Sequence, residues 1–205
     1  MEGSGRHGIF KNVIKLKDKM IPVEMGKSME SEKIMLRKLT EADLADILAV
    51  EIKNKELFEQ FSVTRSPDYY TLEGQAARLQ RQEENRQKDK EYNFGIFLKD
   101  GTLIGSINLV QVVRGPVQSA IMGYTVDQDH NGKGYATDAV KLLVGYAFEE
   151  LLLHRIEAGV KPDHIASIRV LEKAGFHKEG ISQKNVQING VWEDHQMLAI
   201  INPND

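Results

Sequence analysis

The spacing of hydrophobic and polar positions changes along the chain, and each change marks an expected helix or strand. Apolar positions recur over residues 34–39 in the manner of a short strand. Thr40 followed by Asp43 is typical of a helix start, so we expect a helix over residues 41–53. Residues 71–88 carry apolar side chains on one helical face and charges elsewhere, which predicts a surface helix.

Residues 58–70, between these two helices, are expected to form a loop that turns at Ser66-Pro67-Asp68. The loop is rich in aromatic residues, namely Phe58, Phe61, Tyr69 and Tyr70. Two interpretations remain open, because such side chains either cover a cleft or pack onto the core.

Three consecutive segments rich in β-branched and aromatic residues follow, over residues 92–98, 102–113 and 117–126. Short polar turns at Lys99-Asp100-Gly101 and Arg114-Gly115-Pro116 separate them. Turns of this length join antiparallel neighbours, so the three segments predict an antiparallel meander.

The C-terminal part alternates helix and strand. Apolar residues repeat at helical spacing from Ala136 to Leu151, and residues 154–160 predict the next strand. Because a helix separates this strand from residues 117–126, we expect the two strands to be parallel. A further helix over residues 165–174 and a final hairpin complete the pattern, with Gly175 ending the helix, strands over residues 176–186 and 191–201, and Asn189-Gly190 at the turn. The expected fold is α+β, a mixed and mostly antiparallel sheet with helices on both faces.

Composition narrows the class of protein. The 205 residues carry 27 basic and 30 acidic side chains, a formal net charge of -3, which lacks the basic field typical of nucleic-acid binding. There are no cysteines, and no apolar run is long enough to span a membrane. We therefore expect a cytoplasmic protein without direct nucleic-acid or membrane partners, with one domain over residues 31–205 and an unassigned extension over residues 1–30.

The segment over residues 122–140 is an expected strand, a turn containing Gly132 and Gly134, and a helix. Such a turn aims unpaired backbone N–H groups at one point, at the positive end of the helix dipole, and so forms an anion site. A nucleoside-triphosphate loop would need other residues in place of Asp127 and Gly134. A dinucleotide-binding fingerprint would need a small residue in place of Thr137, and it would follow the first strand of a parallel series. The pyrophosphate of coenzyme A is the remaining candidate.

Two motifs, Gly123-Tyr124-Thr125-Val126 and Asn131-Gly132-Lys133-Gly134-Tyr135-Ala136-Thr137, together with the order of elements, resemble the GNAT superfamily of acetyl-CoA-dependent N-acetyltransferases. Three further segments resemble the ribosomal-protein N-terminal acetyltransferases of the RimJ/RimL type: residues 112–115, residues 154–180 and residues 188–195. The resemblance covers roughly residues 34–203. It implies acetyl-CoA as cosubstrate and no metal. The residues that it implies for binding acetyl-CoA are Tyr124, Thr125, Val126, Asn131, Gly132, Lys133, Gly134, Tyr135, Ala136, Thr137, His164 and Ser167.

Two positions depart from the superfamily pattern. Asp129 stands where the family usually has Gln or Arg, and its carboxylate should repel a pyrophosphate unless it points away. His164 stands where the family commonly has Asn, whereas Ser167 three residues later is retained.

Acetyl transfer to an amine needs a neutral amine, a donor to the developing oxyanion and a proton for the departing thiolate. The resemblance implies a backbone N–H near Tyr124 for the oxyanion. Ser167 is the candidate for the thiolate's proton, and Tyr124 is the alternative hydroxyl. No residue stands out as the base; the candidates are Glu157, Glu193, Asp194 and His195.

The acceptor is expected to meet Phe61, Tyr70 and Arg114. An α-amine has a pKa near ~8 and a lysine amine near ~10.4, so weak provision of a base favours the N-terminal amine of a protein, with ribosomal proteins as candidates. Two alternatives stay open: a small amine such as a polyamine or an antibiotic, and a coenzyme A-binding module without catalysis. Both a monomer and a homodimer are compatible with the sequence.

Overall fold

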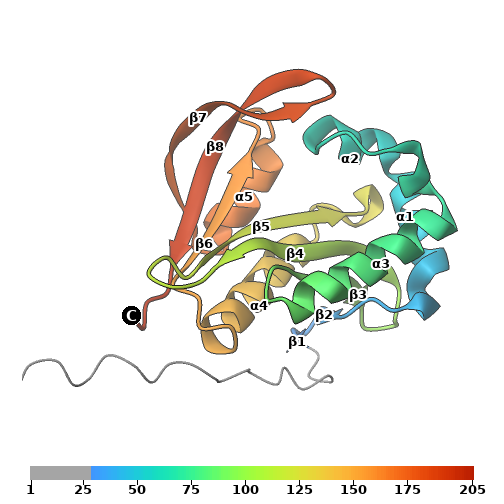
Figure 1. The fold of residues 1–205 in the computed structure, drawn as a ribbon, viewed down its shortest axis with the longest axis horizontal. Coiled ribbons are helices and arrows are strands. Elements are labelled where there is room, and N and C mark those ends of the chain that lie inside the picture. Colours follow the sequence, from blue (N-terminus) through green and yellow to red (C-terminus); the bar gives the residue numbers. More distant parts are fainter. Residues whose placement is uncertain (1–28) are drawn as a thin grey trace, which may run out of the picture.

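The computed structural model describes residues 29–205, and their centre is a single mixed sheet (Figure 1). Eight strands within this range pair in the order β1-β2-β3-β4-β5-β6-β8-β7. All neighbours are antiparallel except β5 and β6, which are parallel as the crossover connection predicted. The strands are β1 Met29–Glu30, β2 Ile34–Arg37, β3 Tyr92–Leu98, β4 Leu103–Val113, β5 Ser119–Val126, β6 Arg155–Val160, β7 His177–Ile188 and β8 Val191–Ile201.

Helices cover both faces of this sheet (Figure 1), which confirms the predicted fold class. On one face α4 packs on the central strands with Ala139, Val140, Leu143 and Ala147 fully buried. On the other face α1 and α3 enclose a smaller cluster around Ile47. The α-helices are α1 Leu44–Lys53, α2 Lys55–Phe61, α3 Leu72–Gln87, α4 Tyr135–Glu149 and α5 Ile165–Lys173, with 3-10 turns at η1 Glu41–Asp43, η2 Pro67–Tyr70 and η3 Gln128–His130.

The sheet opens between β5 and β6. Their pairing is limited to the first residues of β5, Ser119 to Ile121, which face Arg155 to Glu157. Beyond that point β5 stays paired with β4 as far as Val126, while β6 stays paired with β8 as far as Val160. The two halves of the sheet therefore diverge, and no strand of the described residues pairs with the edge of β5 from residue 122 to residue 126 on the β6 side.

The expected loop over residues 58–70 is wrong in part. Its first residues continue α2, which ends at Phe61, and its last residues form the 3-10 turn η2. In the first turn of α2 the backbone carbonyl of Asn54 accepts from the N–H of Phe58 at 2.9 Å, and the Phe58 side chain is buried. Aromatic residues without a clear period hid this helical turn in the sequence.

At the N-terminal end, Met29–Glu30 form strand β1, antiparallel to β2. The rest of the expected extension, residues 1–28, lies outside the described residues.

Candidate active site

The turn before α4 has the geometry of an anion site. Gly132 and Gly134 have φ angles of 77° and 85°, a left-handed conformation that glycine adopts without strain. Gly134 is the N-cap of α4, and no side chain caps the helix. None of the backbone N–H groups from Gly132 to Thr137 donates a hydrogen bond to another part of the described chain. The turn therefore presents unpaired donors at the N-terminus of a 15-residue helix.

A second observation indicates that the turn has room for a bulky anion. A Cβ atom added at Gly132 would meet nothing within 4 Å, so the space beside the glycine is open. The ammonium of Lys33 lies 3.5 Å from the carbonyl of Lys133, and Lys133 itself is exposed. Donors, open space and cations at one turn suit a pyrophosphate.

Asp129, expected to repel such an anion, is held by a cation. Lys53, the last residue of α1, donates to Asp129 at 2.6 Å and to the buried Asp127 at 2.8 Å. The hydrogen bond to Asp127 is the largest of the effects that raise the pKa of Lys53. The positive charge of Lys53 thus offsets one of the two carboxylate charges of Asp127 and Asp129. Because Lys53 ends α1, these hydrogen bonds also connect the turn to the helix on the opposite face of the sheet.

Along the open edge of β5, successive side chains point to opposite faces of the sheet. Thr125 faces the α1 side, where its hydroxyl lies 3.3 Å from that of Ser106. Tyr124 faces the α5 side, and its phenol lies 2.8 Å from the hydroxyl of Ser167 and 3.2 Å from the Ser167 carbonyl. Val126 is buried at the end of the strand.

The contact between Tyr124 and Ser167 spans the opening of the sheet, because Ser167 lies in the first turn of α5. Burial raises the pKa of Tyr124 to about 12, so its phenol stays protonated at neutral pH. The Ser167 hydroxyl and the Tyr124 phenol, both protonated, therefore lie within hydrogen-bond distance at the point where β5 and β6 diverge.

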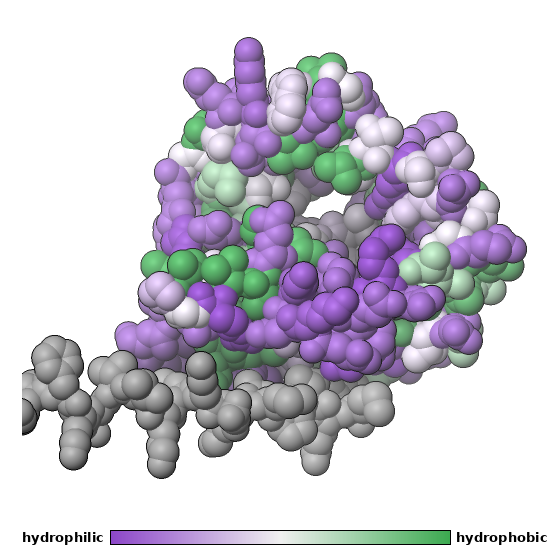
Figure 2. Space-filling view, in the orientation of Figure 1, coloured by the Kyte–Doolittle hydropathy of each residue, from purple (hydrophilic) through white to green (hydrophobic). Residues whose placement is uncertain are grey.

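The side chains of Phe61 and His164 meet across the same opening. Their rings are stacked with centroids 3.8 Å apart and planes 14° from parallel. Phe61 ends α2, and His164 directly precedes α5. Figure 2 shows an opening in this face of the molecule, framed in Figure 1 by α2, β5 and the β7–β8 hairpin.

Hydrogen bonds between α2 and the β7–β8 turn complete the frame. The backbone N–H of Asn189 donates to the hydroxyl of Thr64 at 3.1 Å, and its side-chain amide donates to the carbonyl of Glu59 at 3.0 Å. The Thr64 hydroxyl also lies 3.3 Å from the Asn189 side-chain oxygen. We call these contacts the Asn189 bridge.

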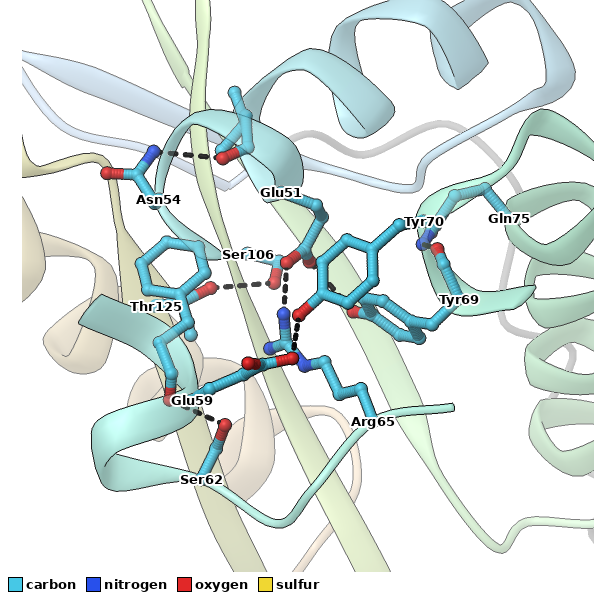
Figure 3. A network of polar contacts seen from close by, with 12 residues as sticks. Glu51, Asn54, Glu59, Ser62, Arg65, Tyr69, Tyr70, Gln75, Ser106 and Thr125 are labelled. Atoms are coloured by element: carbon cyan, nitrogen blue, oxygen red, sulfur yellow. Dashed lines mark hydrogen bonds and ion pairs between the residues drawn. The ribbon is translucent and has the colours of Figure 1, made fainter. Parts of the chain in front are cut away.

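A polar cluster below α2 was not found from the sequence (Figure 3). Glu51 is 4% exposed, accepts a hydrogen bond from Tyr69 at 2.8 Å, and forms ion pairs with Arg65 and, at 3.5 Å, with Arg78. The only sequence signal was an acidic residue four positions after Ile47 on the buried face of α1. Glu51 holds the segment after α2 against α1.

Tyr70 lies beside this cluster, and Arg114 does not. The Tyr70 phenol donates to Glu59 at 2.7 Å, and burial raises the pKa of Tyr70 to about 12. Arg114 follows β4 at the β4–β5 turn, at the opposite end of β5 from Val126. Its guanidinium pairs with Asp89 at 2.6 Å and donates to the Leu151 carbonyl at 2.5 Å. The structure does not bring Arg114 together with Tyr124 and Ser167.

The four candidate bases are engaged elsewhere. Glu157 accepts from Arg155 at 2.6 Å and Glu193 from Lys161 at 3.3 Å, while Asp194 accepts from the backbone N–H of Lys184 at 2.8 Å. His195 is 6% exposed, with Nδ1 3.3 Å from the Glu193 carbonyl.

The match to a family model now gives the class of protein: residues 33–177 match the acetyltransferase (GNAT) domain, and the chain belongs to this family of N-acetyltransferases. The Probable N-acetyltransferase YjcK of Bacillus subtilis is 55% identical over 178 residues, covering 86% of this chain and 98% of that protein. The [Ribosomal protein uS5]-alanine N-acetyltransferase of Escherichia coli is 27% identical over 85% of this chain and 91% of its own length.

Solved structures agree with this assignment. The ribosomal-protein-S5-alanine acetyltransferase of Vibrio fischeri superposes with a TM-score of 0.82 at 30% identity, over 87% of this chain and 98% of that one. Mycobacterium smegmatis RimJ, solved in complex with CoA-disulfide, superposes with a TM-score of 0.80 at 26% identity, over 83% of each chain. The relatives thus include ribosomal-protein acetyltransferases of the RimJ type. No helix of the described residues is long and apolar enough to cross a membrane.

Proposed function

We propose that this protein transfers the acetyl group of acetyl-CoA to the N-terminal α-amine of a protein, with residues 31–205 acting as one domain. The observation that supports this most is the row of unpaired N–H groups from Gly132 to Thr137, next to the open edge of β5. These donors suit the pyrophosphate of coenzyme A, and the edge of β5 offers backbone groups to an extended arm. Acetyl-CoA supplies an activated acetyl group as a thioester.

The chain's own residues then have separate roles. Backbone N–H groups of residues 132–137 hold the anion, and Lys133 adds charge at the rim. A backbone N–H at the open edge of β5 donates to the carbonyl oxygen as negative charge develops. Ser167 gives its hydroxyl proton to the departing sulfur, and the Tyr124 phenol, 2.8 Å away, orients that hydroxyl. The attacking nitrogen loses its extra proton to solvent, and Ser167 recovers a proton from solvent through the Tyr124 phenol, so that an amide and a free thiol are released.

The α-amine is favoured as acceptor for two reasons. The Escherichia coli and Vibrio fischeri relatives are named as acetylating an alanine of ribosomal protein S5. An α-amine, with a pKa near ~8, is also about a tenth neutral at pH 7, whereas a lysine amine is almost wholly charged. A site whose carboxylates are already engaged in ion pairs or hydrogen bonds suits the weaker demand.

Free-thiol release tests the proposal with three sets of acceptors: peptides starting with Ala or Ser, the same peptides blocked at the N-terminus but containing lysine, and polyamines or aminoglycosides. Release with open N-termini and none with blocked ones is expected. Release confined to polyamines or aminoglycosides contradicts the proposed acceptor. Coenzyme A binding by calorimetry without turnover of any amine contradicts catalysis.

A further inference from the structure

Several acidic side chains lie on the elements around the opening, and the following ones each have a cation or a hydrogen-bond donor beside them. Glu51 pairs with Arg65 and Arg78, and Glu59 accepts from the Tyr70 phenol. The three carboxylates and the histidine among the sequence candidates are engaged as described above. Each of these carboxylates is thus held by a contact within the protein, which fixes its position relative to that partner.

His164 differs from all of them. Neither ring nitrogen of His164 has a hydrogen-bond or ion-pair partner within residues 29–205. The ring is half-buried with one face covered by Phe61, so its edge with the nitrogens is the part left available. Its backbone carbonyl accepts from the N–H of Ser167 at 3.1 Å, which places His164 one helical turn before the proposed acid.

The surroundings of His164 favour the neutral imidazole. Burial lowers the pKa of His164 below its usual value, and the nearby Asp163 opposes this only in part. The ring also sits at the N-terminus of α5, whose dipole disfavours an added positive charge. Of the other titratable groups on the elements around it, Lys161 pairs with Glu193 of β8, Tyr124 of β5 is protonated, and Glu59 of α2 accepts a hydrogen bond from the Tyr70 phenol.

We infer that His164 is the general base of the reaction and takes a proton from the ammonium form of the acceptor. This inference rests on the proposed function. The N–H bond of the ammonium breaks, its proton binds a ring nitrogen of His164, and the amine is left neutral with its lone pair free. The imidazolium then returns the proton to solvent. A base of low pKa is uncharged at pH 7 and can remove a proton from an α-ammonium group. A lysine ammonium has a higher pKa and gives up its proton less readily.

The substitution His164→Gln tests the inference through the pH profile of kcat/KM with an Ala-starting peptide. In the unaltered enzyme, activity should fall on the acid side only below the pKa of His164. In the variant, it should fall below about pH 8, where the α-amine itself becomes protonated. The deficit should be at least about tenfold near pH 6.5 and shrink to about twofold near pH 9. His154→Gln, an exposed histidine paired with Asp205, is the matched control and should keep the original profile.

Two measurements do not depend on turnover. A histidine NMR titration should give His164 a pKa below 6.5, and Phe61→Leu should raise that pKa, because the stacked ring shields the imidazole from water. Calorimetry should give His164→Gln an affinity for coenzyme A within about threefold of the unaltered protein.

Three results would overturn the inference. The first is a deficit that does not vary with pH, and the second is a large loss of coenzyme A affinity, which would assign His164 to cofactor binding. The third is an unchanged rate. If the unaltered protein acetylates no amine, the proposed function fails as well. If it acetylates peptides while the variant keeps its profile, only the role of His164 fails.

Discussion

Ser167 is the residue on which the proposed chemistry depends most directly. Its hydroxyl is 2.8 Å from the Tyr124 phenol at the opening of the sheet. Ser167→Ala should lower kcat at least about tenfold, because the departing thiolate loses its proton donor, while coenzyme A affinity stays within about threefold. Steady-state kinetics and calorimetry measure the two quantities. The control is Ser182→Ala on β7, which should leave both unchanged; an unaltered kcat in Ser167→Ala would remove Ser167 from the mechanism.

Individual residues differ in how far the sequence could place them. Tyr124, Ser167 and His164 were identifiable because each lies in or near a short motif. The partner of Asp129 was not, since Lys53 lies 76 positions away and only the tertiary fold brings the two together. Glu51 was also missed, because an acid on an apolar helix face gives no hint that Arg65, Arg78 and Tyr69 surround it.

At the scale of elements, the start of α1 depends on a buried carboxylate. Asp43 accepts two hydrogen bonds from Arg37, at 2.6 and 2.9 Å, and one from the Thr40 backbone N–H at 2.8 Å. The hydrogen bond from Arg37 is the main cause that lowers the pKa of Asp43 to about 2. A carboxyl with a depressed pKa stabilises the fold above its unfolded value near ~3.9, and this stabilisation is lost as the pH falls towards 2.

Asp43→Asn should therefore reduce the free energy of unfolding by about 2 kcal/mol at pH 7, and by progressively less below about pH 4. Urea unfolding at several pH values measures this difference. Asp46→Asn, an exposed acid on the same helix, is the control and should have a smaller effect that varies less with pH. An Asp43→Asn deficit that is the same at pH 7 and at pH 3 would mean that the carboxylate's charge contributes nothing.

The strands were predictable from local pattern, but the extent of their pairing was not. Alternating apolar residues and short turns predicted the β3–β4–β5 meander and the final hairpin. The parallel β5–β6 pair followed from the helix between them, yet only the structure shows that pairing stops at Ile121. No local pattern in the sequence records where a pairing between two strands ends.

For the whole molecule, we expect the Asn189 bridge to limit how an acceptor reaches the opening. The bridge joins α2 to the β7–β8 turn, so the opening seen in Figure 2 is enclosed on the side where these segments meet. An enclosed entrance suits a narrow, flexible chain end and hinders a lysine on a folded surface. Selection of the acceptor would then come from the frame of the opening as well as from the pKa of the amine.

Asn189→Gly tests this argument without distorting the turn, because the φ of 49° at this position suits glycine. The two side-chain contacts, to Thr64 and to the Glu59 carbonyl, are lost, while the backbone bond to Thr64 remains possible. Amide hydrogen exchange over residues 62–66 should become faster. The ratio of lysine to N-terminal acetylation should rise about threefold or more, measured by mass spectrometry on a folded protein acceptor. Faster exchange with an unchanged ratio would show that the bridge orders the segment after α2 without selecting the acceptor. The preference for α-amines would then depend on proton transfer alone.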